Sequence, residues 1–190
     1  SNTSLCNLCF GITSGSNYLY VTSSINKGDF SHVTLMYDKL GDKRAKILID
    51  NNQVMSSSNQ VAFSNLDYNA SNLTIGSGEN VRLNNQVFTQ QQTFSGSIDD
   101  LRFFHSVNPV AKIKKYKLKS YYQDKNDPTL KLYYRFNEPY GTYTGSDILL
   151  DASGNSLHSR IENYISYNRL TGSDNPVLAE DVNRNPVLFP

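Results

Sequence analysis

Residues 28–38 read Gly-Asp-Phe-Ser-His-Val-Thr-Leu-Met-Tyr-Asp, and residues 45–54 read Ala-Lys-Ile-Leu-Ile-Asp-Asn-Asn-Gln-Val. Each stretch holds a run of residues that favour extended backbone, with apolar side chains alternating on one side. Asn51 and Asn52 tolerate positive φ angles and so favour a tight hairpin, after which Val54 begins a return strand. The two stretches therefore predict half-buried strands, the second of which turns back on itself.

Similar short segments recur along much of the chain, each bounded by Gly, Asn, Asp or Ser. Regular spacing with turn signals between segments is typical of a β-sandwich rather than of alternating strands and helices. The composition agrees, because 13 Tyr and 9 Phe favour strands and can supply much of a core. The segments predicted as strands are Leu8–Thr13, Tyr18–Ser23, His32–Tyr37, Ala45–Asp50, Val61–Ser64, Asn72–Gly76, Gln86–Thr89 and Phe94–Phe104.

One helix is predicted, from Val110 to about Tyr122, where apolar residues recur at helical spacing. It follows Pro109, and proline is favoured in the first turn of a helix. Five lysines lie between the apolar positions. We interpret them as a solvated helix face rather than as a patch for an anionic ligand. They are Lys112, Lys114, Lys115, Lys117 and Lys119.

Three blocks in order resemble a laminin G-like domain of the concanavalin A-like superfamily. Gly28–Asp38 is similar to the pattern G-x-W-x-H-V-A-x-T-Y-D, with Phe30 where tryptophan is usual. Ala45–Val54 is similar to L-Y-V-D-G-x-x-V. Leu73–Gly76 with Phe94–Phe104 is similar to L-x-I-G followed by F-x-G-x-I-D-E-V-R-I-Y. The resemblance implies an all-β, antiparallel jelly-roll β-sandwich with one short closing helix.

A fourth block is out of order. Leu132–Gly141 and Asp151–His158 resemble the family's opening signature, Y-x-F-D-E-x-x-G followed by D-x-S-G-N-x-x-H, yet they come after the closing helix. One explanation is that the chain joins the end of one repeat to the start of the next. We prefer it, because self-similarity is typical of tandem arrays. The other is that the late strand closes the first sandwich, as in a circular permutation.

The predicted domain organisation follows from this order. Residues 1–122 form a laminin G-like sandwich, which lacks its first strands if the chain comes from an array. Residues 123–129 are polar, contain a proline and predict a linker. Residues 130–166 are the opening strand and loop of a second repeat or the closing strand of the first. Residues 167–190 show little periodicity and predict an extended C-terminal tail.

The carboxylates and histidines argue against catalysis. Glucanases of this superfamily need paired carboxylates in E-x-D-x-x-E spacing on one strand, and no glutamate of the chain has an acidic partner at that spacing. Asp99 and Asp100 are adjacent, so their side chains diverge on a strand. Each of the three histidines falls in or directly after a block of the family resemblance, which indicates a structural role rather than a serine triad. We therefore predict that the chain is not an enzyme. The histidines are His32, His105 and His158.

The resemblance implies a calcium ion, or no cofactor at all. By resemblance, Asp99, Asp100 and Glu138 are the candidate metal ligands, since Ca²⁺ takes carboxylate and carbonyl oxygens. The alternative is that Asp100 pairs with Arg102. Separately, Asp151 and Asn155 could form an oxygen-rich turn for a metal, or Asp151 with Ser153 could form an Asx-turn.

Other features limit the partners. The net charge of +1 argues against nucleic acid, and no apolar run is long enough to insert into a membrane. Cys6 and Cys9 should face opposite sides of one strand, as two buried or half-buried thiols. N-glycosylation sequons begin at Asn2, Asn69 and Asn72.

These observations predict a structural, assembly or adhesion module of a larger extracellular, cell-surface or virion protein. Its partners would be other protein subunits or neighbouring repeats of the same chain. The alternative is a carbohydrate-binding module, calcium-dependent if the metal site exists, in which tyrosines stack on sugar faces and amides bind hydroxyls. The composition, rich in Asn, Ser and Tyr, fits either function.

Overall fold

The chain begins with two long antiparallel strands, β1 (Leu5–Ser14) and β2 (Asn17–Asn26), which pair along their full length. The loop between them starts at Gly15, whose φ of +58° suits a type II′ hairpin turn. Burial alternates residue by residue along β1, as expected for a strand with one face on a core. Both strands are longer than the predicted segments Leu8–Thr13 and Tyr18–Ser23.

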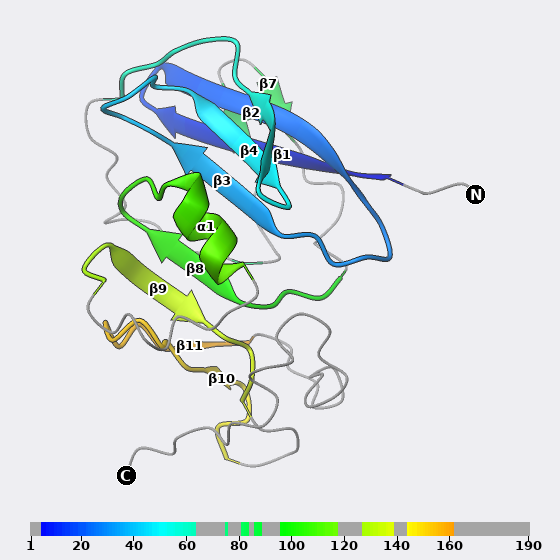
Figure 1. Ribbon diagram of the computed structural model, residues 1–190, viewed down its shortest axis with the longest axis vertical. Coiled ribbons are helices and arrows are strands. Elements are labelled where there is room, and N and C mark those ends of the chain that lie inside the picture. The colour runs from blue at the N-terminus through cyan, green and yellow to red at the C-terminus, as the bar shows by residue number, and fades with distance from the viewer. Residues whose placement is uncertain are drawn as a thin grey trace. The chain divides into compact units, whose positions relative to one another are not determined.

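The computed structural model of the chain describes residues 5–63, 75, 81–83, 86–88, 96–117, 127–138 and 144–161. The chain divides into two compact units, unit 1 (Ser1–Gly96) and unit 2 (Ser97–Pro190) (Figure 1). The predicted strand Asn72–Gly76 lies outside the described residues except at Ile75, and the predicted tail, residues 167–190, lies outside them entirely.

A three-stranded antiparallel sheet follows in unit 1, in the order β3 (Val33–Tyr37), β4 (Ala45–Ile49) and β5 (Asn52–Ser56). The predicted tight hairpin is present, but its turn lies one residue earlier than the predicted pair Asn51-Asn52. Asp50 and Asn51 have φ angles of 50° and 69°, which is the type I′ pattern, and Asn52 already pairs with Ile49.

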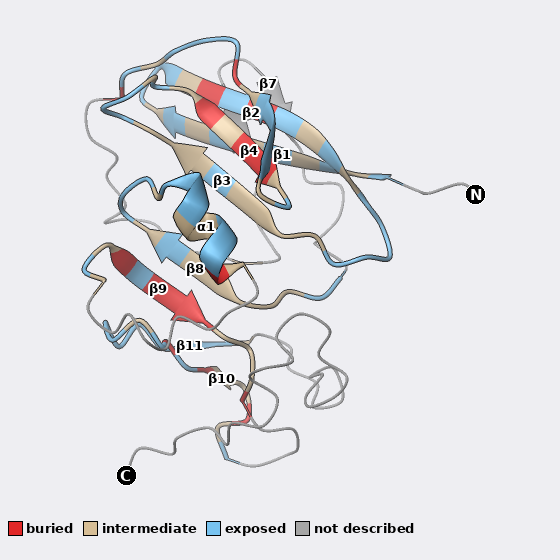
Figure 2. Cartoon of the chain, viewed as in Figure 1, coloured by how far each residue is buried: buried red, intermediate tan, exposed pale blue. Residues whose placement is uncertain are grey.

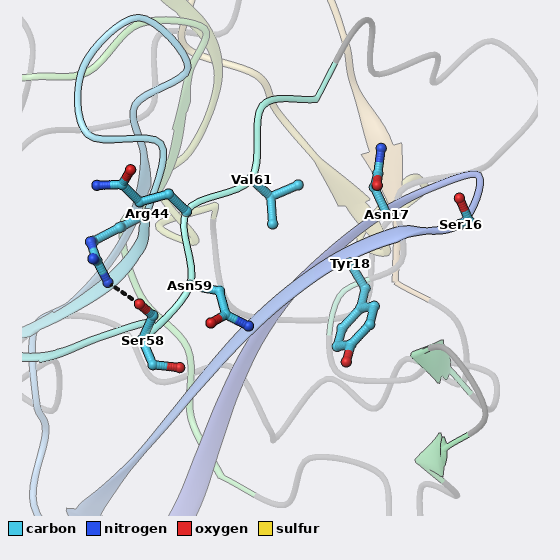
Figure 3. Close-up of a pocket in the computed structure, with 8 residues that line it drawn as sticks. Ser16, Asn17, Tyr18, Arg44, Ser58, Asn59 and Val61 are labelled. Atoms are coloured by element: carbon cyan, nitrogen blue, oxygen red, sulfur yellow. Dashed lines mark hydrogen bonds between the residues drawn. The ribbon is translucent and has the colours of Figure 1, made fainter.

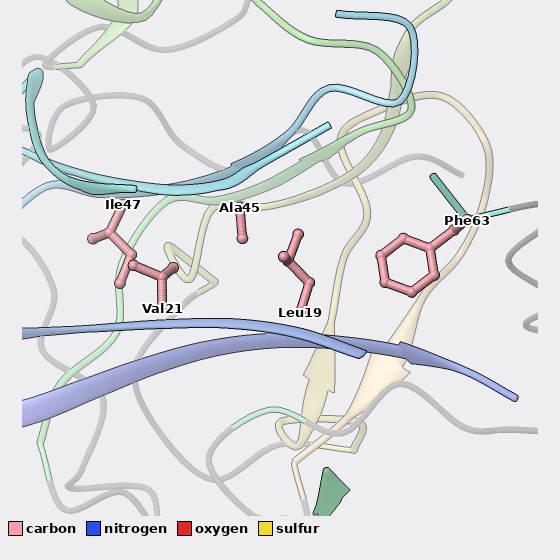
Figure 4. Close-up of a cluster of buried hydrophobic side chains, with 5 residues drawn as sticks. All are labelled: Leu19, Val21, Ala45, Ile47 and Phe63. Carbon is pink, nitrogen blue, oxygen red and sulfur yellow. The ribbon is translucent and has the colours of Figure 1, made fainter. Parts of the chain in front are cut away.

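The two sheets of unit 1 face each other across a buried apolar core (Figure 4). Leu19 and Val21 of β2 meet Ala45 and Ile47 of β4, and Phe63 completes the cluster. All five are at most 4% exposed, and each large side chain in such a core contributes about 1.5–3 kcal/mol through burial. The described elements are mostly strands with one helix, as the sequence predicted, and the jelly-roll order of the strands stays a prediction.

The segment after β5 is not the predicted strand Val61–Ser64 over its described residues, 61–63. Instead, side chains hold it: the Tyr37 hydroxyl donates to the Val61 carbonyl at 2.8 Å, and the Tyr37 ring meets Phe63 edge-on, with centroids 5.4 Å apart. The apolar residues of this segment therefore serve the core without joining a ladder.

A short hairpin completes the described part of unit 1. β6 (Val81–Leu83) pairs antiparallel with β7 (Gln86–Phe88). β7 agrees with the predicted segment Gln86–Thr89, whereas β6 was not predicted.

In unit 2, β8 (Leu101–Phe104) pairs antiparallel with β9 (Leu130–Tyr134). The predicted strand Phe94–Phe104 is too long, because residues 97–100 are irregular and Asp100 has a φ of 55° that interrupts extended backbone. Two short strands, β10 (Ile148–Leu149) and β11 (Ser159–Arg160), also pair. The out-of-order block thus pairs with the strand of the third block; its place in a repeat stays a prediction.

The helix α1 (Val110–Tyr116) begins directly after Pro109, as predicted, and Tyr116 joins a small buried cluster with Leu130 and Tyr133. Residues 118–122 of the predicted helix lie outside the described part of the chain. Lys112 forms an ion pair with Asp127 at 2.6 Å. Most of the helix surface is exposed, which agrees with a solvated face (Figure 2).

Candidate functional site

The predicted metal ligands of unit 2 do not form a metal cluster. Within the part of the chain that the structure describes, no group of three or more His, Cys, Asp or Glu side chains could hold a metal ion. Asp100 forms an ion pair with Arg102, the alternative considered from the sequence, and Asp99 precedes it in the irregular segment. Glu138 is buried and accepts a hydrogen bond from the Leu150 N–H at 2.8 Å. The carboxylates of Asp100 and Glu138 thus have different local contacts, and a calcium site at these three residues stays a prediction.

Asp151 occupies the centre of a hydrogen-bonded loop. Its carboxylate is buried and accepts bonds from the N–H groups of Tyr133 at 2.9 Å, Ser153 at 2.9 Å and Leu157 at 3.0 Å. The Ser153 hydroxyl donates a fourth, at 2.7 Å. The contacts with Ser153 confirm the Asx-turn, and the whole set joins the loop to β9.

The electrostatics of Asp151 follow from these donors. Burial alone would raise the pKa of its carboxyl, because it disfavours the charged form. The N–H and hydroxyl donors stabilise the carboxylate more strongly, and the net pKa lies below the ordinary value of 3.8. Asp151 is therefore a charged structural acceptor, with its oxygens already used by the fold.

The rest of the signature extends the same arrangement. The Asn155 amide donates to the carbonyls of Leu130 and Lys131, both at 3.1 Å, and the His158 Nδ1 accepts the Asp151 N–H at 3.0 Å. The residues of Asp151–His158 thus bind backbone groups of β9 and of their own loop. We call this arrangement the Asp151 clamp.

The other two histidines lie beside turns of the structure. His105 Nδ1 lies 3.1 Å from the Thr129 carbonyl oxygen, between β8 and the turn before β9. The backbone N–H of His32 donates to the Asp50 carboxylate at 3.3 Å, beside the β4–β5 turn. The sequons at Asn2, Asn69 and Asn72 lie outside the described residues.

Unit 1 presents a polar face without charge on the β1–β2 hairpin. From Leu5 to Asn26 the sequence holds no Asp, Glu, Lys, Arg or His. Because Leu19 and Val21 point into the core, Tyr18 and Tyr20 belong to the opposite face, where their rings stack with centroids 6.3 Å apart and planes 13° apart. We call this surface the outer hairpin face. It also carries Asn7, Cys9, Gly11, Thr13, Thr22 and Ser24 and, at the end away from the turn, Leu5 and Asn26.

The cysteines follow the pleat of β1. Both are free; Cys6 is half-buried, whereas Cys9 is exposed on the outer hairpin face and not buried or half-buried as predicted. Partial burial nevertheless raises the pKa of the Cys9 thiol. The thiol is thus no stronger a nucleophile than an ordinary cysteine.

A polar pocket of about 600 Å³ opens beside the turn of the same hairpin (Figure 3). Arg44 is held there, since its guanidinium donates to the carbonyls of Ser57 and Ser58. In Figure 3 the Tyr18 ring points away from Arg44, toward the other side of the hairpin. Amide and hydroxyl groups dominate the lining, which consists of Ser16, Asn17, Tyr18, Arg44, Ser58, Asn59, Gln60 and Val61.

The loop between β3 and β4 carries a leucine that is 94% exposed, Leu40. The Asp38 carboxylate accepts the N–H groups of Leu40 at 3.1 Å and of Gly41 at 2.8 Å, and the Asp38 carbonyl accepts the Lys43 N–H at 3.0 Å. A side chain at position 41 would collide with the Asp38 carboxylate, since its Cβ would lie 2.3 Å from Oδ2. The loop thus holds Leu40 outward in a defined position.

Sequence reasoning missed both surfaces of unit 1. Tyrosines at positions i and i+2 of a strand share a face, so the Tyr18–Tyr20 spacing was a usable signal. The signal for the exposed Leu40 was weaker, because it consisted only of Asp38 and Gly41, two residue types that favour turns.

One comparison with known proteins places the chain in a family. A family model described as the concanavalin A-like lectin/glucanases superfamily matches residues 3–114. The search of curated proteins and the search of solved structures gave no match. Domains of this laminin G-like kind are generally non-catalytic binding modules and typically extracellular. Among the described residues, no helix has the length and apolar character needed to cross a membrane. The chain belongs to the concanavalin A-like lectin/glucanase superfamily.

Proposed function

We propose that the chain is a structural, assembly or adhesion module of a larger extracellular, cell-surface or virion protein, acting through protein–protein contacts. The observation that carries this proposal is Leu40. An apolar side chain that is 94% exposed gains about 1.5–3 kcal/mol when a partner buries it.

The loop that holds Leu40 supports the same function. The Asp38 bonds and the tight approach at Gly41 order the loop before any partner arrives. Binding then costs less conformational entropy than it would from a disordered loop. A pre-ordered apolar anchor of this kind suits a protein pocket, because apolar anchors seated in pockets contribute much of the affinity in protein interfaces.

Site-specific photocrosslinking in the complete parent protein tests this proposal. A photoreactive residue replaces Leu40 in one variant and Gln53, an exposed residue of β5, in the matched control. We expect Leu40 to crosslink to one defined segment of another subunit or a neighbouring repeat, and the control not to. Protein crosslinking at position 40 no greater than at position 53 would count against the proposal.

A second function, carbohydrate binding, is favoured by a different observation. The outer hairpin face combines two stacked tyrosines with exposed hydroxyl and amide groups. Aromatic rings accept apolar faces, while hydroxyls and amides both donate and accept hydrogen bonds. A glycan array probed with and without EDTA tests it. Saturable binding would support the function, and loss of binding in EDTA would assign it to the calcium-dependent form. An array without any saturable signal would refute it.

A further inference from the structure

The outer hairpin face lacks charge in a chain that has plenty elsewhere. The protein carries 18 Lys and Arg and 17 Asp and Glu, yet none of them falls between Leu5 and Asn26. A surface for nucleic acid or an acidic glycan needs cations to neutralise the ligand. A surface for a folded protein partner usually has an apolar centre, whereas glycine and threonines lie beside the tyrosines here and the exposed Leu5 lies at the far end of the hairpin. The remaining ligand class is polar and uncharged.

The centre of the face is built as a platform. Tyr18 and Tyr20 have nearly parallel rings, and Tyr20 remains 47% exposed. Gly11 lies directly opposite Tyr20 in the register, so the position across the hairpin carries no side chain. A ligand that lies over the exposed part of the Tyr20 ring can therefore extend over the glycine.

Polar groups continue from this platform along the hairpin. Thr22 is opposite Cys9, and Ser24 is opposite Asn7, with the Ser24 hydroxyl donating to the Asn7 side-chain oxygen at 3.1 Å. Ten residues of strand span about 33 Å at about 3.3 Å per residue. A face of that length accommodates a chain of sugars rather than a single ring.

We propose that the outer hairpin face binds an uncharged oligosaccharide, whose sugar rings lie across Tyr18 and Tyr20 and whose hydroxyls bond to the neighbouring Thr, Ser and Asn side chains. This inference rests on the second proposed function, carbohydrate binding, and assigns its site and ligand class. It requires no metal ion.

The first test is a glycan array that contains neutral, sulfated and sialylated oligosaccharides, probed with the whole chain. A neutral oligosaccharide should bind, with the same affinity in EDTA and at about 0.1 M and 1 M salt, because no charge is involved. A preference for sulfated or sialylated glycans would overturn the inference. An array without any hit would overturn both the inference and carbohydrate binding, while leaving the protein-contact proposal intact.

The second test locates the site with calorimetric titration of the best neutral glycan. Tyr20→Ala should weaken binding about tenfold, as the loss of one stacking ring predicts. Tyr20→Phe should bind nearly as well as the original chain. Phe30→Ala is the matched control, since Phe30 is also about half exposed (46%) but lies outside the hairpin. Normal binding by Tyr20→Ala with loss in Phe30→Ala would place the sugar elsewhere, and would refute the inference without refuting carbohydrate binding.

A third readout does not depend on how Tyr20→Ala folds. Cys9 is exposed on the face and Cys6 lies on the opposite side of β1. A saturating neutral oligosaccharide should slow alkylation of Cys9 at least threefold and leave Cys6 unchanged. Equal alkylation rates at Cys9 with and without the bound sugar would overturn the inference.

Discussion

The outer hairpin face and the Asp151 clamp are both rich in polar residues, but they use them in opposite ways. On the outer hairpin face, side chains without charge are exposed or half-buried, and the Ser24 hydroxyl bonds to Asn7 at the surface. In the clamp, a charged carboxylate points inward and accepts four hydrogen bonds, three of them from backbone N–H groups. The family match, residues 3–114, includes the hairpin and ends before the clamp, which only resembles the family's opening signature. The polar residues of the clamp hold the fold, whereas those of the hairpin are exposed and could contact a ligand.

The largest expected effect is that of removing the clamp carboxylate. Asp151→Ala leaves the buried N–H donor of Tyr133 and the part-buried donors of Ser153 and Leu157 without their acceptor, and should destabilise unit 2 by about 3 kcal/mol. Faster hydrogen exchange of the β9 amides measures it. Asp147→Ala is the control, because Asp147 forms a pair with the exposed Arg160, and such surface pairs contribute about 0–1 kcal/mol. Similar exchange rates in the two variants would mean that the Asp151 carboxylate stabilises unit 2 no more than an exposed ion pair does.

Acid should weaken unit 2 through the same group. The folded pKa of Asp151 lies below its ordinary value of 3.8, so its contribution to stability is complete above that value. The contribution is lost progressively as pH falls below about 4 toward the folded pKa. Asp127, whose pKa is lowered as well by Lys112 and Thr129 despite burial, adds to the effect. Circular dichroism melts between about pH 6 and 3 should show a smaller decline in Asp151→Asn than in the original chain. Equal declines would contradict this role for Asp151.

Asn155→Ala should have a moderate effect. Its amide donates to two carbonyls of the β9 region, and a hydrogen bond of this kind contributes about 0.5–1.5 kcal/mol. The free energy of unfolding, measured by urea titration, should therefore fall by about 1–2 kcal/mol, which is less than for Asp151→Ala. A larger shift than that of Asp151→Ala would place the centre of the clamp at Asn155 instead.

The smallest effect is expected on the outer hairpin face. Asn7→Ala removes only the exposed bond from Ser24 and should change the free energy of unfolding by less than about 0.5 kcal/mol. A loss comparable to that of Asn155→Ala, measured by the same urea titration, would mean that the hairpin polar groups also hold the fold.

Local chemistry in the sequence predicted the β4–β5 hairpin and the start of the helix, because turns and caps depend on a few adjacent residues. Pro109 precedes α1 as predicted, while the β4–β5 turn lies at Asp50-Asn51 because cross-strand pairing, not the asparagine pair alone, sets its register. Contacts between residues that are far apart in the sequence were harder to predict. The pairing of Asp100 with Arg102 could be anticipated from their spacing, but the three backbone donors to Asp151 come together only in the folded chain.

The most direct test of the contrast between clamp and hairpin is a thermal unfolding midpoint. It is measured for the original chain and for Asp151→Asn, each in about 5 mM CaCl₂ and in EDTA. A ligand that binds the folded state raises the midpoint. If the Asp151 clamp is purely structural, calcium leaves both midpoints unchanged, and Asp151→Asn melts lower in both solutions. A midpoint of the original chain that rises with calcium, together with no such rise in Asp151→Asn, would contradict the account and make the signature residues a ligand site.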